Sequence, residues 1–281
     1  MAFFKRIQKK VVFSLLFFLL AGMIVFPIFA SNGISRMVYF YNPETNINNF
    51  ASLKALFDEY LSFYGNYKFQ PFNKKKIFEK TAEKIDASSL FILSSWHFSS
   101  LTKKIPLNPL LIAQREGKFT FKKVLLARKP FSKLDDLANK TIASSGTKEY
   151  TLSLLNEMVD KDKDVILAGI RILSVPKDID ALMSVGFGVA QAAIATEASL
   201  KQIEQINPKL KEKLTNLLTS NEILLPIVSS KSRGADKESI NKLITILKAM
   251  SISNIGKENL ATLSIDKWAS IPPDIMERLN K

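Results

Sequence analysis

The run Ser144-Ser145-Gly146-Thr147 is the stretch of this chain whose residue types most directly suggest chemistry. It lies between a short β-rich segment and a segment with helical spacing of its apolar residues. Small hydroxyls and free amide N–H groups at a helix N-terminus stabilise an oxyanion without a full positive charge. The run therefore predicts an anion contact through Ser144, Ser145 and Thr147, although ordinary helix N-capping explains the same residue types.

The other candidate ligand contacts follow the ends of other expected strands. In open α/β sheets, ligands bind beyond the carboxyl ends of the strands. Tyr41 and Trp96 could wall a cleft and each donate a hydrogen bond, or simply pack in the core. His97 could contact a ligand, or be a capping or packed side chain, and Glu197 could pair with a ligand amine or face solvent. The full set of candidates at these strand ends is Tyr41, Asn42, Ser94, Trp96, His97 and Glu197.

Composition excludes several classes of chemistry. The chain has no Cys and a single His, which rules out disulfides, thiol nucleophiles, Cys-ligated zinc and multi-His metal sites. The Gly186-Phe187-Gly188 run does not continue into a dinucleotide fingerprint, because position 191 is Gln, and no P-loop is present. The sequence therefore nominates no catalytic residue, no metal site and no cofactor. Catalysis by hydroxyls or carboxylates on the same fold remains the enzymatic alternative.

Alternation of β-rich and amphipathic segments predicts an α/β fold with two lobes, each a mostly parallel sheet flanked by helices. Two chain crossings, near 115–121 and 221–226, would join the lobes as a hinge. The expected first lobe is 31–118 plus 227–281, and the expected second lobe is 119–226. The expected strands are 37–41, 67–72, 89–93, 124–128, 141–144, 171–175, 192–195 and 224–229. The expected helices are 49–64, 74–85, 133–139, 149–159, 179–185 and one through 243–250, with a short opening turn after Ser94 and a short terminal segment.

The first thirty residues form a separate segment. Four cations at Lys5, Arg6, Lys9 and Lys10 precede an apolar run over 11–29 that ends at Ala30. This pattern predicts a signal peptide cleaved after Ala30, and the length of the run leaves an uncleaved membrane anchor as the alternative. Either way the basic flank places residues 31–281 outside the cytoplasm.

The first thirty residues supply four of the net charge of +14, so residues 31–281 carry a net charge of +10. The other cations are mostly Lys and are scattered, which is typical of a solvated surface. Nucleic-acid binding requires a clustered basic face with interleaved aromatic residues, so no nucleic-acid partner is expected. The surplus is compatible with an anionic ligand.

The order of elements resembles the periplasmic solute-binding proteins of ABC importers, of the phosphate/phosphonate-binding type with the type 2 periplasmic binding protein fold. The segments that carry the resemblance are Tyr41-Asn42-Pro43, Ser89–Phe98, Arg115-Glu116-Gly117, Val124–Lys129, Leu134–Ala143 and Asp180–Ala195. The resemblance implies a monomer that closes on a small anionic solute and delivers it to an inner-membrane ABC permease. A membrane-tethered domain of the same fold that signals instead of transporting is the alternative.

Three positions depart from the family pattern. The second-lobe loop reads Ser-Ser-Gly-Thr where the family's phosphonate binders carry Ser-Thr-Ser-Gly. Lys177 stands where a family His often follows the next strand, and it could neutralise an anion or be a solvated surface residue. Gln191 replaces the acid expected before the small apolar strand. The architecture is therefore better supported than phosphonate as the ligand.

Overall fold

The computed structural model describes residues 36–45, 49–159 and 169–280. The predicted signal or anchor segment over 1–30 lies outside the described residues. In the ranges that the structure describes, no helix combines the length and apolar character needed to cross a membrane.

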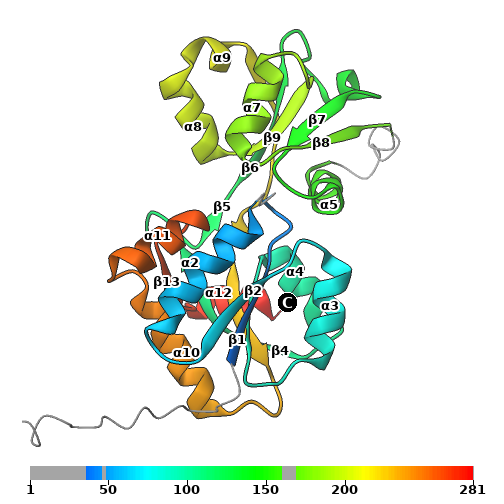
Figure 1. Cartoon of the computed structure of the whole chain (residues 1–281). Coiled ribbons are helices and arrows are strands. Elements are labelled where there is room, and N and C mark those ends of the chain that lie inside the picture. The colour runs from blue at the N-terminus through cyan, green and yellow to red at the C-terminus, as the bar shows by residue number, and fades with distance from the viewer. Residues whose placement is uncertain (1–35, 46–48, 160–168, 281) are drawn as a thin grey trace, which may run out of the picture. The chain divides into compact units, whose positions relative to one another are not determined.

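The first lobe is built on a six-stranded mixed sheet (Figure 1). The strand order is β13-β4-β12-β3-β1-β2. Only the β1–β2 and β1–β3 pairs are parallel, because β12, inserted between β3 and β4, runs antiparallel to both, and β13 runs antiparallel to β4. The strands are β1 Arg36–Tyr41, β2 Tyr67–Pro71, β3 Leu90–Leu93, β4 Leu107–Gln114, β12 Ile227–Lys231 and β13 Lys267–Ser270.

Alternation along β1 and β3 explains how this sheet is buried on both faces. Successive side chains of a strand point to opposite faces. Val38 and Ile92 face one core, with side chains of α2 (Phe50–Ser62) and α10 (Lys237–Ala249). Tyr41 and Phe91 face another, with side chains of α3 (Lys75–Lys84) and α4 (Ser95–Thr102). A strand covered on both faces is apolar throughout, which is why 89–93 was recognisable in the sequence.

The second lobe is built on a five-stranded mixed sheet with the order β10-β6-β9-β7-β8. The strands are β6 Lys123–Arg128, β7 Thr141–Ser144, β8 Arg171–Ser174, β9 Ala192–Thr196 and β10 Leu214–Thr219. One face packs on α5 (Lys148–Met158), and the other on α7 (Asp178–Gly186) and α8 (Glu197–Ile206). The chain also forms a 3-10 helix at Leu134–Leu137, within the expected helix over 133–139, and α9 at Pro208–Glu212.

The two expected crossings pair with each other. Strand β5 (Thr120–Phe121) lies antiparallel to β11 (Ile223–Leu224) in a separate two-stranded sheet between the two larger ones. The expected hinge therefore coincides with a short β-ribbon, whose paired backbones keep the two passages of the chain together.

Three expectations about the elements are wrong, and some elements were not expected. The sheets are mixed, not mostly parallel, because the strands that follow each crossing enter antiparallel to their neighbours. The single strand expected over 224–229 is split into β11 and β12 around Pro226, whose ring fixes φ and removes an N–H donor. A short terminal segment was expected after α10, but the chain there forms three more elements: α11 (Asn254–Thr262), β13 and α12 (Pro273–Leu279). Strands β4 and β10 were not expected at all.

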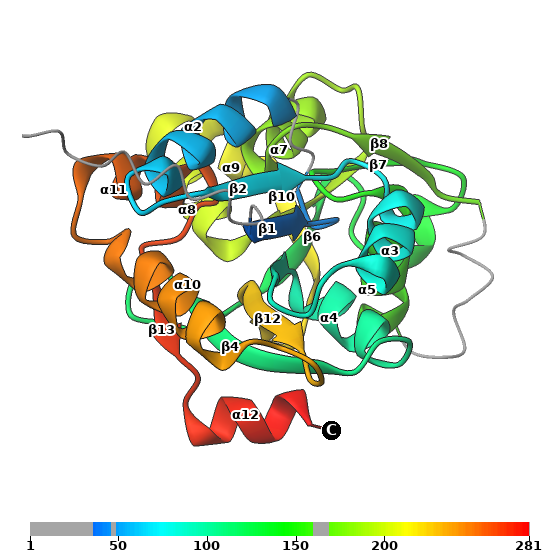
Figure 2. The same ribbon diagram turned by 60° about the horizontal axis from the view of Figure 1, so that its bottom comes forward.

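Contacts across the lobes come from α3, α4 and α5. Lys75 of α3 forms an ion pair with Glu149 of α5 at 2.5 Å, and the two helices lie side by side in Figures 1 and 2. The indole Nε1 of Trp96, on α4, donates to Ser153 Oγ at 3.0 Å.

Candidate functional site

A cavity of about 580 Å³ lies between the two sheets, at the carboxyl ends of β1, β7 and β9. We call it the main cavity. Both lobes and both crossings line it, so a solute here would contact the parts that a hinge moves. Its lining residues are Phe40, Asn42, Glu44, Thr45, Asn49, Arg115, Phe121, Lys123, Ser145, Pro176, Lys177, Asp178, Ile179, Thr196, Ser199, Gln202, Leu225, Pro226, Ala261, Thr262, Leu263 and Ser264.

Asp178 organises the second-lobe wall of the main cavity. Its carboxylate accepts from Lys123 Nζ at 3.0 and 3.3 Å, from Ser145 Oγ at 2.5 Å and from the Thr196 backbone N–H at 2.7 Å. Burial opposes ionisation of this carboxyl. The Lys123 charge and the hydrogen bonds from Ser145, Lys123 and Thr196 outweigh the effect of burial, so the pKa of Asp178 lies below its ordinary value. One carboxylate thus ties together the ends of β6, β7, α7 and β9.

Glu44 contributes a second carboxyl from the first lobe, in the loop after β1. The side chain is buried, and its Oε1 has no hydrogen-bond partner among the described atoms. Burial raises the pKa of Glu44 to about 7, and the Lys123 charge and a hydrogen bond with Ser94 act in the opposite direction. At neutral pH this carboxyl is therefore close to its titration midpoint, so it can donate or accept.

Arg115 lines the main cavity and, like Lys177, forms no ion pair with a carboxylate of the described residues. Its Nε donates to the Ser264 carbonyl, and no ion pair occupies the guanidinium within the described ranges. Burial lowers the pKa of Arg115, while the charges of Asp266 and Asp178 favour the protonated form. The side chain stays cationic, since arginine does not deprotonate in proteins. Its remaining N–H groups are suited to an anion.

The Ser144–Thr147 run is close to the main cavity, but its donors are largely used by the protein itself. Thr147 N–H donates to the Pro43 carbonyl at 2.7 Å, and Ser145 Oγ also lies 3.2 Å from the Glu44 carbonyl. Gly146 N–H donates to Ser144 Oγ at 3.2 Å. Thr147 is the N-cap of α5, accepting from the Tyr150 N–H at 3.3 Å. In this conformation the helix N-terminus binds the first lobe's backbone where an oxyanion was expected.

Of the ten predicted contact residues, the structure brings three to the main cavity: Asn42, Ser145 and Lys177. Trp96 lines a second, smaller cavity. The other six line neither: Tyr41, Ser94, His97, Ser144, Thr147 and Glu197.

Tyr41 and His97 belong to the aromatic core between β1, α3 and α4. Their rings meet edge to face with centroids 4.7 Å apart, and burial raises the pKa of Tyr41 to about 12. His97 is fully buried with Nε2 3.3 Å from Glu79, and burial lowers its pKa to about 4, so the ring is neutral. Ser94 caps α4 by accepting from the His97 N–H, and Glu197 is exposed in the first turn of α8.

Four charged residues of the main cavity other than Lys177 were missed by the sequence: Glu44, Arg115, Lys123 and Asp178. Asp178 follows Lys177 directly and begins the helix that comes after a strand. A polar residue at such a strand end is a candidate ligand contact, so this position could have identified Asp178 from the sequence. Lys123 and Arg115 flank one expected crossing, and their place beside it was the available signal. Nothing local distinguishes Glu44 from the other acids of the chain.

Comparisons with known proteins agree with this architecture. The family model described as "ABC transporter, phosphonate, periplasmic substrate-binding protein" matches residues 83–274. No curated protein matches the sequence.

Three solved structures show the shared fold. A binding-protein component of a phosphonate ABC transporter from Pseudomonas aeruginosa is 16% identical, with a TM-score of 0.63, covering 88% of this chain and 86% of that one. PhnD1 from Prochlorococcus marinus, in complex with methylphosphonate, is 14% identical with a TM-score of 0.60, covering 88% and 98%. A protein from Xanthomonas citri bound to ATP is 14% identical with a TM-score of 0.61, covering 88% and 95%.

Proposed function

This chain belongs to the family of periplasmic substrate-binding proteins of phosphonate ABC transporters, and we propose that it captures a small phosphonate-type anion in its main cavity. The family consists of binding proteins, not enzymes, and implies a small-molecule ligand and an ABC permease as partners. It also implies a periplasmic location and favours import over signalling by a tethered domain.

The observation that carries the ligand class is the guanidinium of Arg115, which faces the main cavity without a carboxylate partner among the described residues. Lys177 supplies a second, exposed cation to the lining of this cavity. Lys123 does not add to this charge, because Asp178 neutralises it. Protonated Glu44 would donate a hydrogen bond to an anion, whereas its ionised form would repel one.

Calorimetric titration with methylphosphonate, phosphate and methanesulfonate tests the ligand class. Arg115→Gln should weaken methylphosphonate binding by about tenfold or more, the size of one lost charge-assisted hydrogen bond. Arg233→Gln, an exposed arginine outside both cavities, is the matched control and should leave the affinity unchanged. Equal affinities for wild type and Arg115→Gln would contradict the assignment of Arg115. Failure of all three anions to bind would contradict the ligand class itself.

A pH series separates the contribution of Glu44. Methanesulfonate does not titrate near neutrality, so a fall in its affinity as pH rises through about 7 would report Glu44 losing its proton. Glu44→Gln keeps a neutral donor and should flatten the profile. An unchanged slope in that variant would show that Glu44 does not face the ligand.

We also propose that residues 1–30 are an export signal removed after Ala30 and that the mature protein is a monomer. The lobe boundaries that we propose remain 31–118 plus 227–281 and 119–226, which is supported by the strands that make up each sheet. Mass spectrometry of the exported protein tests the cleavage, since a mature chain must begin at Ser31. Light scattering of that material tests the monomer.

A further inference from the structure

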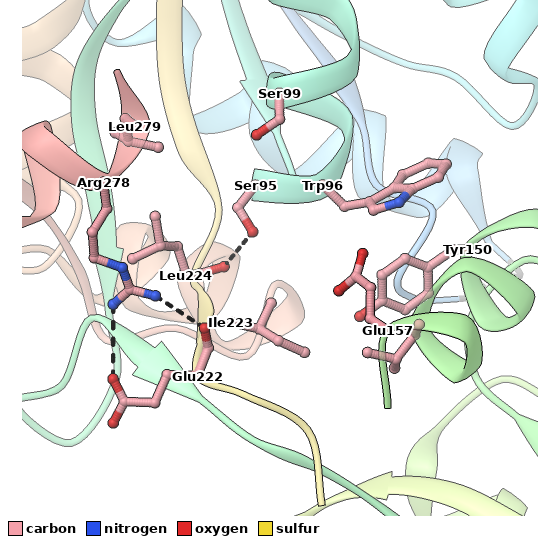
Figure 3. A pocket seen from close by; sticks show the side chains of 11 residues that line it. Ser95, Trp96, Ser99, Tyr150, Glu157, Glu222, Ile223, Leu224, Arg278 and Leu279 are labelled. Carbon is pink, nitrogen blue, oxygen red and sulfur yellow. Dashed lines mark hydrogen bonds and ion pairs between the residues drawn. The ribbon is translucent and has the colours of Figure 1, made fainter. Parts of the chain in front are cut away.

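The end of the second-lobe sheet that lies away from the main cavity carries exposed apolar side chains and cations. Strand β6 begins at Lys123, which lines the main cavity, and ends at Arg128. Helix α7 likewise begins beside the main cavity and ends at Gly186. We call the surface at these far ends, made of residues 128–129, 187–189 and 206–213, the distal surface. It shares no residue with the main cavity or with the smaller cavity that Figure 3 shows.

Close packing between distant segments makes the distal surface continuous. A Cβ added to Gly186 would lie 3.0 Å from a methyl carbon of Leu210, so the end of α7 lies directly against α9. A Cβ added to Gly188 would lie 3.1 Å from Arg128 Nη1, so the loop after α7 lies against the end of β6. Figure 1 shows α7, α8 and α9 side by side in this lobe.

Three apolar side chains project from the distal surface. Phe187 is 75% exposed, Val189 60% and Ile206 63%. Phe187 and Val189 stand on either side of Gly188, whose φ of 77° turns the chain there. Ile206 ends α8, directly before α9. Large apolar side chains gathered on an exposed surface mark a contact with a protein or a membrane.

Cations surround these apolar side chains. They are Arg128, Lys129, Lys209, Lys211 and Lys213, all exposed except the half-buried Lys211. The Lys129 N–H donates to the Lys213 carbonyl at 2.9 Å, which brings the two basic segments together. Within the described ranges, none of the five forms an ion pair with a carboxylate. Glu212 is the one acid of the distal surface, so the charge of this surface is strongly positive.

An anionic bilayer is the partner that fits both features. Apolar side chains that project from a turn and a helix end can enter the headgroup layer of a membrane, which has no fixed pockets to match. Lysine and arginine side chains beside them attract anionic lipids, each by a modest amount that adds to the others. A protein partner would instead call for a packed, shape-complementary face.

We propose that the distal surface binds the surface of an anionic phospholipid membrane, with Phe187, Val189 and Ile206 in the headgroup layer and the five cations on lipid phosphates. The proposed capture of a solute does not use this surface. Because no residue is shared with the main cavity, lipid binding and solute binding should be independent.

Co-sedimentation of residues 31–281 with sucrose-loaded vesicles tests the proposal. Residues 35–281 form a compact unit that contains every described helix and strand, so this part folds without the apolar run over 11–29, which would itself bind lipid. At low ionic strength, phosphatidylcholine vesicles with about 30% phosphatidylglycerol should bind the protein at least tenfold more tightly than phosphatidylcholine alone. No binding to the mixed vesicles, or equal binding to both kinds, would overturn the proposal.

Matched variants locate the lipid contact. Ile206→Ser should weaken binding to the mixed vesicles at least fivefold, whereas Ile252→Ser, at a first-lobe residue that is 79% exposed, should not. The triple change Lys209→Gln, Lys211→Gln and Lys213→Gln should also weaken it at least fivefold. The control triple, with the same change of net charge at three exposed lysines of the first lobe, is Lys74→Gln, Lys76→Gln and Lys80→Gln.

Equal losses in the two triple variants would show that overall charge attracts the lipid, and unchanged binding of Ile206→Ser would show that no apolar side chain enters the membrane. Either result overturns the proposal. Circular dichroism shows whether each variant is folded, and Phe187→Ser replaces Ile206→Ser in the test if that variant is not. The affinity for methylphosphonate should be the same in all of these variants, so a failure of lipid binding is distinguishable from a failure of the solute site.

Discussion

Replacing Lys123 with Met should destabilise the protein more than the same change at an exposed lysine, because it leaves a buried carboxylate without its ion-pair partner. The Lys123 side chain is 3% exposed and that of Asp178 10%. After the substitution, Asp178 keeps the hydrogen bonds from Ser145 and from the Thr196 N–H, but it loses its ion-pair partner. The methionine side chain fills about the same volume, so loss of packing is a minor factor.

Breaking a buried ion pair by removing one partner costs about 3–5 kcal/mol. Two hydrogen bonds to Asp178 survive, so we expect the lower end, about 3 kcal/mol, for Lys123→Met. Asp178→Asn should cost a similar amount by stranding the ammonium. The double variant removes both charges, and its cost should fall below the sum of the single costs by about 2 kcal/mol.

Urea unfolding at pH 7, followed by circular dichroism, measures these free energies. Lys242→Met is the matched control, because Lys242 forms an exposed ion pair with Glu238 at 2.7 Å and its removal should change little. The reasoning is refuted if Lys123→Met costs no more than the control, or if the double variant equals the sum of the singles.

The pH dependence of the same pair has a definite sign. The pKa of Asp178 is lowered in the folded state from an ordinary value near 3.8. Its contribution to stability is therefore present above the unfolded-state pKa and is lost as pH falls through the folded-state pKa. The stability difference between wild type and Asp178→Asn should shrink in acid below about pH 4, and its growth in acid would contradict the assigned direction.

Three further predictions concern groups around the two cavities. Burial raises the folded-state pKa of Glu44 to about 7 from 4.5, so its ionisation opposes folding as pH rises between those values. The free energy of unfolding of wild type, measured with urea, should therefore fall by about 3 kcal/mol relative to Glu44→Gln as pH rises from 4.5 to 7. The control variant Glu204→Gln should not reproduce the effect of Glu44→Gln. Tyr150→Phe removes an unpartnered buried hydroxyl and should leave the thermal midpoint unchanged or raise it; a fall of several degrees would show that the hydroxyl has a partner. Gly146→Ala would place a Cβ 2.6 Å from the Tyr150 ring and 3.3 Å from the Pro43 carbonyl, so it should cost about 1–3 kcal/mol, and a neutral result would contradict the close packing.

The sequence predicted most strands and helices because each leaves a local signal of burial. Continuous apolar character marked β3, and period-3.6 spacing marked α2. A hydrophobic pattern does not tell whether a strand runs parallel or antiparallel to its neighbours. That direction depends on which end of the sheet the chain enters after a crossing. Strand β12 reads as a buried strand in any orientation, yet it lies antiparallel between β3 and β4 after the second crossing. The error in sheet type follows from that single limitation.

The site was predictable to the extent that strand ends mark it. Asn42 and Ser145 were nominated by that rule and Lys177 by the family resemblance, and all three line the main cavity. Glu44 and Asp178 were not, because a carboxyl's role depends on burial and on partners from distant segments. Asp178 takes its partners from three separate strand ends, and no spacing rule joins them.

The α5 N-terminus shows how one local pattern serves two physical purposes. Its hydroxyls and amides suit an oxyanion, as the sequence predicted, and carbonyl oxygens present the same partial negative charge. Here the Pro43 carbonyl, from the first lobe, accepts from the Thr147 N–H at 2.7 Å, and the Asp178 carboxylate accepts from the Ser145 hydroxyl at 2.5 Å. The helix terminus thus joins the two lobes directly. Recognition of an anion in this conformation must therefore depend on the side chains of Arg115 and Lys177, whose charges no carboxylate within the described ranges pairs.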